Sequence, residues 1–568
     1  MLLSLVLIVP CLLLVAAGIV MIGRETPRFI HAKLAAYPIG LAFLGAIGTL
    51  ILVTSQGPVT VRLYDPSSVA SFIIPLGFYV DRLSAVMMTL ITGVSTIIYC
   101  YSTRYMYQDR HARRYLVLIC LTDFVLICMV SSGNLMMLFL FWQILSYLLY
   151  LLAHNHIHPA TLAGAFKTFT LLRIADTAFL GGIALAYQLY GTLEFHELFA
   201  RAAATSMTLS ILPGIDVSGT TAVTFFLFIG AMGKSAQFPL HLWLPGSLFA
   251  PTPVHALLHA GIINAGGFLI NRLAPLFGLS STTLHIAFVI GTLTAVLGAT
   301  MMLAQNDIKK TLGFSTIGQM GYMIMECGLG AFSLAVFHLI AHGLFKATVF
   351  LNCGNVIHKA RQEPHVPHTN HEDEEAGFSR LTWSTGFVTT LFIPLLILLI
   401  THGVLRIPLL ESQGTVIILF FIWITSSQAI LTLTRLRAVA SWKVSTAMLL
   451  TLLFTVFVYL FAVESFTAFL YPDPNEVTSY FKAAHLPDWL FDVIVVMASL
   501  MTIFGWTYLY LRAHGRSIWI PTWIENLRIR LYTVFLNRLY ADELYQLIGS
   551  TTTHLVHRID KLERGWSR

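Results

Sequence analysis

Charged residues are scarce in this 568-residue chain: they make up 11% of it, whereas hydrophobic residues make up 57%. A water-soluble domain is nearer half apolar and carries about a quarter charged residues. This composition therefore excludes a set of soluble domains. Apolar runs recur along the chain, and those of about 20 residues are long enough to cross ~30 Å of hydrocarbon. A transmembrane β-barrel is also excluded, because its strands alternate apolar and polar residues instead of forming such runs.

Cysteine is also scarce, with six residues in all and no Cys-x-x-Cys pair. The cysteines lie in or beside apolar segments, which argues against a disulfide framework and against a zinc or iron–sulfur site built from them. The sequence therefore predicts no metal site and no cofactor, and nothing in it indicates a nucleic-acid partner.

Positive charge is missing before the first apolar run, since the first basic residue is Arg24. A cleavable signal peptide would place positive charge ahead of that run. We therefore expect the first helix to remain in the mature protein.

The apolar runs predict an all-α polytopic membrane protein with about fifteen transmembrane helices. With the N-terminus outside, most Lys and Arg of the short loops fall inside, whereas the loop 464–488, which falls outside, is acidic. This agrees with the positive-inside rule and places the C-terminus in the cytoplasm. The predicted spans are 2–22, 35–54, 83–102, 115–131, 134–153, 164–188, 221–240, 253–272, 283–303, 311–327, 331–351, 383–403, 414–432, 444–463 and 489–511.

Two polar stretches fall on the predicted cytoplasmic side. Residues 358–380 are rich in histidine and acidic residues, and residues 514–568 form a basic tail with tryptophan and tyrosine. Both are candidate docking surfaces for a partner. The tail has a second interpretation, since basic segments with aromatic residues also lie along membrane surfaces.

A lysine and four prolines interrupt one apolar segment. Lys234 lies inside it, and Pro239, Pro245, Pro251 and Pro253 follow. Proline removes a backbone donor and disfavours helix before it. A helix broken inside the membrane is tolerated only where it lines protein or water. We therefore expect a broken helix near Lys234, with a lysine able to release a proton; the alternative is a lysine that extends to the membrane interface.

Histidines and a lysine recur at helical spacing in two other apolar segments. His255 and His259 are four residues apart, and His338, His342 and Lys346 repeat that spacing. Residues at this spacing share a helix face. Because neutral histidine can both give and accept a proton, the pattern predicts a proton relay. Hydrogen bonding between helices and a metal-ligand row remain open alternatives.

Four more ionisable residues lie within apolar segments. Arg173 and Asp176 are three residues apart and are predicted to form a structural ion pair. Asp123 and Glu326 are isolated acids. A charge in the hydrocarbon costs at least ~2.5–3.5 kcal/mol, so each needs a partner or a chain of waters, and both are candidates for the cation pathway.

The segment GAMGKSAQFPLHLWLPGSLFAPTPVHALLHAGIINAGGFLI, at 230–270, resembles the hallmark of the antiporter-like membrane subunits. That family includes the L, M and N subunits of respiratory complex I, the large Mrp Na+/H+ antiporter subunits and the membrane arm of some hydrogenases. Supporting matches are RIAD at 173–176 and FHLIAHGLFKATVFLNCGNVIH at 337–358. The resemblance is strong over 75–360 and weak elsewhere.

The resemblance implies two inverted repeats of five helices, each with a broken helix, and protons crossing through a line of Lys, His and Glu residues. Lys234 then matches the lysine of the broken helix, and His259, His338, His342 and Lys346 match the central relay. Arg173 and Asp176 match the family's Arg-x-x-Asp pair. The implied division of the chain is N-terminal helices at 1–114, a first repeat at 115–275, a second, diverged repeat at 276–463 with the loop 358–380, and the last helix and basic tail at 464–568.

Two departures from the family distinguish this chain. The family usually has a glutamate at the position of Gln143, and we hypothesise that Asp123 replaces it as the partner of Lys234. The span 383–403 contains no Lys, Asp or Glu, although the family usually has a charged residue in that broken helix. An ordinary complex I pump subunit is therefore not expected.

The chain best resembles the DabB family, the antiporter-like subunits of two-component inorganic-carbon pumps. This implies a non-enzymatic transporter subunit of the bacterial inner membrane, coupled to H+ or Na+, whose partner is DabA, a zinc protein resembling carbonic anhydrase. The alternatives are a proton-pumping L-type subunit of complex I or of a membrane hydrogenase, a Mrp-type Na+/H+ antiporter subunit, and a non-conducting membrane scaffold.

Overall fold

The computed structural model describes the N-terminal two thirds of the chain and parts of the remainder. The predicted spans 383–403, 414–432 and 444–463, most of the loop 358–380 and most of the basic tail lie outside the described residues. Apart from a few positions inside these ranges and isolated positions beyond them, the described residues are 2–23, 30–64, 76–153, 159–247, 251–362, 465–494 and 522–541.

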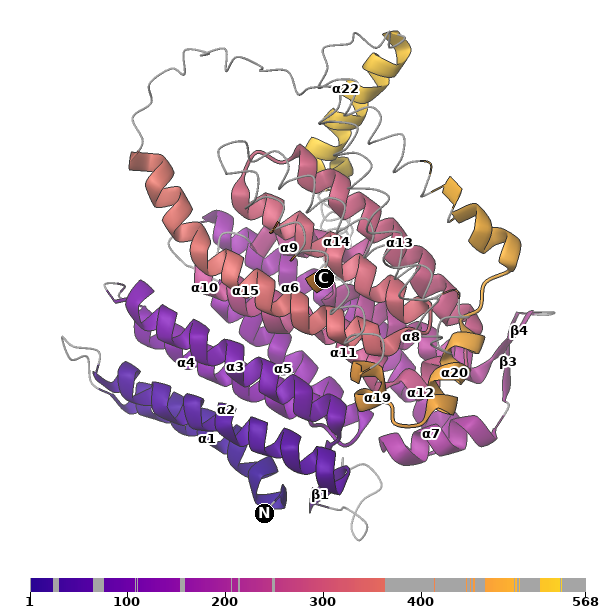
Figure 1. Ribbon diagram of the computed structural model, residues 1–568, viewed down its shortest axis with the longest axis horizontal. Coiled ribbons are helices and arrows are strands. Elements are labelled where there is room, and N and C mark those ends of the chain that lie inside the picture. Colours follow the sequence, from indigo (N-terminus) through magenta and orange to yellow (C-terminus); the bar gives the residue numbers. More distant parts are fainter. Residues whose placement is uncertain are drawn as a thin grey trace, which may run out of the picture.

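Long helices packed side by side form the body of the protein (Figure 1). Among the described residues, eight helices are long and apolar enough to cross a membrane. The predicted all-α membrane fold is therefore confirmed, whereas the number fifteen stays a prediction. The longer helices are α1 (Leu2–Ile22), α2 (Ile30–Gln56), α3 (Arg82–Tyr105), α4 (Ala112–Val130), α5 (Leu135–Ala153), α6 (Pro159–Tyr190), α8 (Gly219–Lys234), α13 (Ser281–Ala304), α14 (Ile308–Gly328), α15 (Phe332–Gln362) and α22 (Thr522–Leu536).

One end of the bundle carries two short β-hairpins that the sequence did not predict (Figure 1). We call it the hairpin end. Short helices lie at the same end, as Figure 1 also shows. The elements there are β1 (Val59–Tyr64) paired with β2 (Leu76–Val80), β3 (Thr208–Leu212) paired with β4 (Ile215–Ser218), α7 (Phe195–Ala204), α12 (Ala274–Phe277), α19 (Phe466–Leu470) and α20 (Pro474–Ala483).

The opposite end is where α3 ends and where α4 and α14 begin, and we call it the basic end. Arg104 lies in the last turn of α3, Arg113 and Arg114 in the first turn of α4, and Lys309 and Lys310 in the first turn of α14. These basic residues, which flank two loops in the described part of the chain, therefore gather on one side of the bundle.

The broken helix forms where the proline cluster predicted it, but the predicted span 221–240 ends too late. α8 ends at Lys234, and the chain turns through Ala236 at a φ of 49°. Pro239 precedes a 3₁₀ turn, η1 (Leu240–Leu242), and Pro245 lies in α9 (Trp243–Gly246). Since proline cannot donate to the preceding turn, the helix stops ahead of this cluster.

The next segment is also irregular. Pro251 and Pro253 begin α10 (Thr252–Leu257), which passes into a π-helical turn, η3 (Leu258–Ile262), and then into α11 (Ala265–Arg272). Together these three elements cover the predicted span 253–272. π-turns inside helices occur frequently at functional sites.

Side chains satisfy backbone groups that the break leaves free. Trp243 Nε1 donates to the carbonyl of Gly233, at 2.8 Å, and Ser235 Oγ donates to the carbonyl of Ile263, at 2.7 Å. An unpaired carbonyl in an apolar interior costs free energy, so these bonds allow the break to lie inside the bundle.

Glycines let α13 and α14 pack backbone to backbone. A Cβ built on Gly298 would lie 2.4 Å from the backbone nitrogen of Gly318, and one on Gly321 would lie 2.4 Å from that of Ala295. Small residues at such contacts are how membrane helices approach closely. This packing fixes the position of α14, which carries Glu326.

Replacing Gly298 with alanine is expected to destabilise the protein by about 1–3 kcal/mol, because the added methyl group forces the two backbones apart. The measurement is the melting temperature of the purified protein in detergent. Gly40→Ala in α2 is the matched control, since a Cβ there meets nothing within 4 Å in the described structure. Equal melting temperatures for the two variants would refute the close contact.

Candidate ion-translocation site

Lys234 is buried at the end of α8, with 1% of its surface exposed. Its Nζ donates to the carbonyl of Trp142, at 3.1 Å, and to Ser146 Oγ, both on α5. The ammonium also lies 4.8 Å from the centre of the Trp142 ring, in the range of a cation–π contact. Lys234 therefore points into the bundle and is held by neutral oxygens and an aromatic face.

The Arg173–Asp176 ion pair connects to this lysine through Trp142. Arg173 Nη2 lies 2.6 Å from Asp176 Oδ2, so the pair expected from the sequence is formed. Asp176 Oδ1 accepts from Trp142 Nε1 at 2.6 Å. Another guanidinium nitrogen of Arg173 donates to Gln143 Oε1. Gln143 thus partners Arg173, while Asp176 supplies the nearby negative charge.

Asp123, hypothesised to partner Lys234, makes no hydrogen bond to it among the described contacts. It is fully buried on α4, and its Oδ1 accepts from Ser95 Oγ on α3 at 2.6 Å. The hydrogen bonds found for Lys234 in the described structure go to α5 alone. The hypothesis of a direct Asp123–Lys234 pair is therefore not supported by the geometry.

Glu326, isolated in the sequence, finds a partner on the next helix. His338 Nδ1 lies 3.1 Å from Glu326 Oε2, and His338 Nε2 lies 2.9 Å from Gln319 Oε1. Sequence reasoning missed Gln319, although it lies seven residues before Glu326 and thus on the same face of α14. Two residues of α14 therefore hold one histidine of α15.

The row on α15 continues from His338 toward the basic end. The rings of His338 and His342 are 6.2 Å apart, and Lys346 Nζ donates to the carbonyl of Leu312 at 3.2 Å. Leu312 lies near the start of α14, whereas Glu326 lies near its end. Eight residues from His338 to Lys346 correspond to about 12 Å along the helix axis. The titratable side chains therefore extend along the bundle from one end toward the other.

His255 and His259 lie beside this row. Both are fully buried, their rings are 6.2 Å apart, and the His259 ring stacks on Phe350 of α15 at 4.3 Å. In the part of the chain that the structure describes, neither ring nitrogen of His259 has a hydrogen-bond partner. Gly343 allows the close approach of α15, because a Cβ there would lie 3.1 Å from the carbonyl of Ala260. The π-turn thus brings His259 next to the row.

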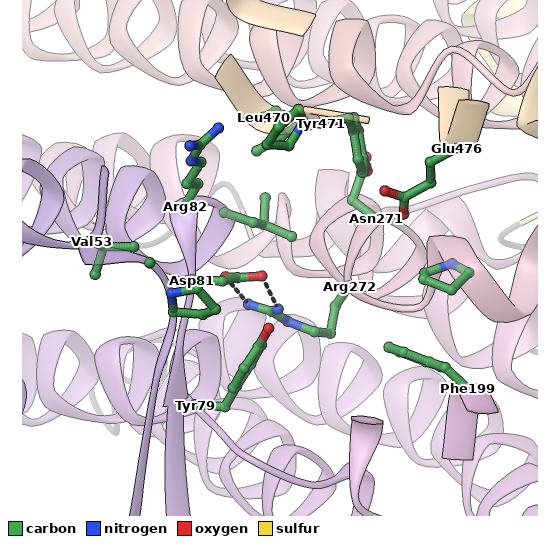
Figure 2. A pocket seen from close by; sticks show the side chains of 15 residues that line it. Val53, Tyr79, Asp81, Arg82, Phe199, Asn271, Arg272, Leu470, Tyr471 and Glu476 are labelled. Atoms are coloured by element: carbon green, nitrogen blue, oxygen red, sulfur yellow. Dashed lines mark hydrogen bonds and ion pairs between the residues drawn. The ribbon is translucent and has the colours of Figure 1, made fainter. Parts of the chain in front are cut away.

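An ion pair between a buried arginine and a half-buried aspartate at the hairpin end escaped the sequence analysis (Figure 2). Arg272, the last residue of α11, donates to both carboxylate oxygens of Asp81, at 2.7 and 3.0 Å, and also to Ser84 Oγ. Asp81 in turn accepts from the backbone nitrogen of Ser84 and so caps α3. The partners are 191 residues apart in sequence, and no local spacing could pair them.

Asp81→Asn is expected to destabilise the protein by about 3–5 kcal/mol at pH 7, because Arg272 would keep a buried charge without its counter-charge. Burial alone would raise the pKa of the Asp81 carboxyl, but the Arg272 guanidinium and the hydrogen bonds lower it below its usual value. The stabilisation is therefore present at neutral pH and is lost as pH falls through this lowered pKa.

The check is the melting temperature of wild-type protein and Asp81→Asn between pH 7 and pH 3. The difference in melting temperature between the two proteins should shrink below about pH 4. Asp216→Asn, at an exposed position in β4, is the control for removing one carboxylate. A difference in melting temperature that stays constant down to pH 3 would contradict the stabilising role of the Asp81–Arg272 ion pair.

A helical bundle with a broken helix, a buried lysine and a row of buried histidines defines a class: a polytopic membrane subunit that translocates cations. The model of the family described as "NADH:quinone oxidoreductase/Mrp antiporter, TM" matches residues 132–425, and that of "NADH-Ubiquinone oxidoreductase (complex I), chain 5 N-terminus" matches residues 67–116. The chain belongs to this family of antiporter-like membrane subunits.

Among individual relatives, the chain is 41% identical to the "Probable inorganic carbon transporter subunit DabB1" of Halothiobacillus neapolitanus, over 82% of this chain and 84% of that protein. It is 36% identical to NADH-quinone oxidoreductase subunit L of Neisseria meningitidis over 56% of this chain, and the match covers 47% of that longer subunit.

Solved structures share the fold at lower identity. The Mrp complex from Dietzia sp. DQ12-45-1b matches with a TM-score of 0.59 and 19% identity, over 96% of this chain and 60% of that one. The archaeal membrane-bound sulfane sulfur reductase matches with a TM-score of 0.53 and 18% identity, over 91% of this chain and 96% of that one. These likenesses support the fold alone.

Proposed function

We propose that this chain conducts protons as the membrane subunit of an energy-coupled inorganic-carbon pump. Proton influx drives a cytoplasmic partner that resembles DabA, a zinc protein similar to carbonic anhydrase, which hydrates CO2 to bicarbonate. Similarity to DabB1, described as a probable inorganic carbon transporter subunit, supports the substrate. The observation that carries the conducting role is the buried titratable row on α15.

The row is suited to protons because its members can exchange them over short steps. Glu326 contacts His338, His342 follows one turn later, and Lys346 reaches the first turns of α14. His255 and His259 border the row, and Lys234 on α8 and Asp123 on α4 are further buried titratable groups. A buried ionisable group is costly in a membrane unless it is partnered or lies on an ion pathway.

The driving force is sufficient to bias hydration in one direction. One elementary charge moving down 100 mV supplies about 2.3 kcal/mol, which exceeds the ~1.4 kcal/mol of a tenfold change in an equilibrium constant. The coupling is allosteric if protonation in this chain and substrate in the partner favour the same conformation of a shared element.

The orientation we propose places the basic end in the cytoplasm and the hairpin end outside. Arginines and lysines of α3, α4 and α14 gather at the basic end, in line with the positive-inside rule. Protons would then enter near Glu326 and leave near Lys346. The loop 358–380 and the basic tail are the proposed docking segments for the partner.

The similarity to subunit L favours one second candidate, a proton-pumping subunit of a redox complex. In that case transport would run outward and be driven by electron transfer in other subunits. The family usually has a glutamate at position 143, whereas this chain has a glutamine there, which accepts a hydrogen bond from Arg173. This departure supports the carbon pump over the redox complex.

The test is bicarbonate accumulation in a host that lacks carbonic anhydrase. The chain is expressed together with a DabA-like partner, with and without an uncoupler. We expect growth in air and labelled bicarbonate accumulation, both abolished by the uncoupler. Accumulation that persists after the proton gradient collapses would support the non-conducting scaffold instead.

A further inference from the structure

The buried ammonium of Lys234 has only neutral hydrogen-bond partners among the described residues. Its Nζ donates to the carbonyl of Trp142 and to Ser146 Oγ, and no carboxylate oxygen accepts from it there. A charge held away from water costs free energy unless a counter-charge acts on it. The counter-charge of this lysine therefore reaches it by some route other than a direct hydrogen bond.

Asp176 on α6 is the carboxylate that lies beside this lysine. The helices α6 and α8 approach closely here, because a Cβ built on Gly233 would overlap that of Ala175. Gly233 directly precedes Lys234, and Ala175 directly precedes Asp176. The charge of Asp176 and that of its partner Arg173 both act on the lysine. Asp176 is thus close enough to influence Lys234, although it is not among the hydrogen-bond partners of Nζ.

One rigid side chain, that of Trp142, contacts both groups. Its Nε1 donates to Asp176 Oδ1 at 2.6 Å, and the centre of its ring lies 4.8 Å from Lys234 Nζ. The side chain is fully buried, and the Phe179 ring of α6 packs edge-on against it at 5.2 Å. The indole N–H is the only strong hydrogen-bonding group of this side chain. Trp142 therefore connects the carboxylate to the ammonium directly.

The connection has an electrostatic consequence. A carboxylate that accepts from the indole N–H polarises the ring and draws the N–H hydrogen toward itself. Electron density on the ring rises as a result, and the face of an indole attracts a cation through this density. Both effects are stronger in a buried site than in water. The negative charge of Asp176 therefore stabilises the ammonium of Lys234 through the indole.

Other charged groups are poorly placed to do this. α5 carries no charged residue. Besides the pair on α6, the described elements that pack against α8 carry these charged residues and histidines: Lys167, Asp216, His241, Arg272 and His285. The carboxylate in this set is exposed in β4, just before α8, whereas Lys234 lies about 22 Å away along the helix axis. Among these elements, Asp176 is thus the carboxylate that can stabilise the charged lysine.

We propose that Trp142 is a positioning residue that transmits the negative charge of Asp176 to Lys234 and so sets the affinity of this lysine for its proton. The proposal rests on the proposed function, in which Lys234 takes up and releases a proton. The indole stabilises the ammonium but keeps it apart from the carboxylate. A direct ion pair would hold the proton more tightly, so the interposed ring leaves the lysine able to release it.

The experiment measures bicarbonate uptake by the complex of this chain with a DabA-like partner in right-side-out vesicles. External pH is varied while the total proton-motive force and the CO2 concentration are held constant. Trp142→Phe keeps an aromatic ring beside Lys234 but has no N–H for Asp176. We expect the half-saturating proton concentration to rise about tenfold, a size that a buried cation–π contact supports, with maximal uptake retained. Trp489→Phe is the matched control, because Trp489 is 69% exposed.

A second series of variants preserves the shape of the side chain, and it decides the matter if Trp142→Phe fails to assemble. Tryptophan with an increasing number of fluorines on its ring is introduced at position 142 alone. The N–H remains available to Asp176, whereas fluorine withdraws electrons from the ring face that the ammonium contacts. The half-saturating proton concentration should rise stepwise with the number of fluorines.

Asp176→Asn tests the origin of the charge. The amide oxygen of asparagine can still accept from the Trp142 N–H, but it carries no charge. Combining this change with Trp142→Phe should raise half-saturation by less than the product of the two single effects, because both changes interrupt one path.

Unchanged half-saturation across the fluorinated series, or single effects that multiply in the double variant, would overturn the proposal. Wild-type uptake that persists without a proton gradient would instead overturn the proposed function.

Discussion

Methionine in place of Lys234 is expected to reduce gradient-driven bicarbonate uptake at least about tenfold, since a barrier increase of 1.4 kcal/mol already has that effect. Methionine keeps most of the side-chain volume but can carry neither a charge nor a proton. Ser146 Oγ already donates to the carbonyl of Trp142, so this carbonyl keeps a partner in the variant. The complex should therefore still assemble.

The measurement is uptake by vesicles with an imposed proton gradient, together with the amount of partner that co-purifies. Lys33→Met is the matched control, because Lys33 is an exposed lysine near the start of α2. Normal uptake by Lys234→Met at wild-type assembly would remove this lysine from the pathway. Loss of the partner would show that the lysine is needed for assembly instead.

His338→Gln is expected to have a comparable effect, again at least about tenfold. Glutamine can still donate a hydrogen bond to Glu326, but it cannot take up and release a proton. The row on α15 would then be interrupted between Glu326 and His342, which the structure places on either side of this residue.

Uptake and the melting temperature are measured together for this variant. His196→Gln, at an exposed position on α7, is the control for replacing one histidine. A variant that melts like the wild type and transports normally would show that protons bypass His338. A large fall in melting temperature would instead assign the Glu326–His338 contact a structural role.

Much of this arrangement can be predicted from the sequence. The first eleven predicted spans coincide with described helices to within a few residues, except that α8 ends at Lys234 instead of residue 240 and α15 ends at Gln362 instead of residue 351. The proline cluster predicted the broken helix, and the four-residue spacing predicted the shared face on α15. These features are local, because the length of an apolar run and the helical spacing of residues both depend only on residues close together in the sequence.

Local sequence patterns did not indicate which side chains would contact one another across different helices. Glu326 looked isolated, yet it contacts His338 from a neighbouring helix. Asp123 was hypothesised to partner Lys234, but it bonds to Ser95. The two β-hairpins were also missed, since their strands are short and lie between long apolar runs that dominate the pattern.

The sequence by itself therefore determined the membrane fold, the position of the helix break and the shared helix face of the titratable residues on α15. Only the tertiary structure decided that Arg173 binds Gln143, that Arg272 pairs with Asp81, and that Glu326 contacts His338. The physical reason is the distance along the sequence over which each property is set. Partition into a membrane depends on the composition of one segment, whereas a contact between distant segments depends on how whole helices pack.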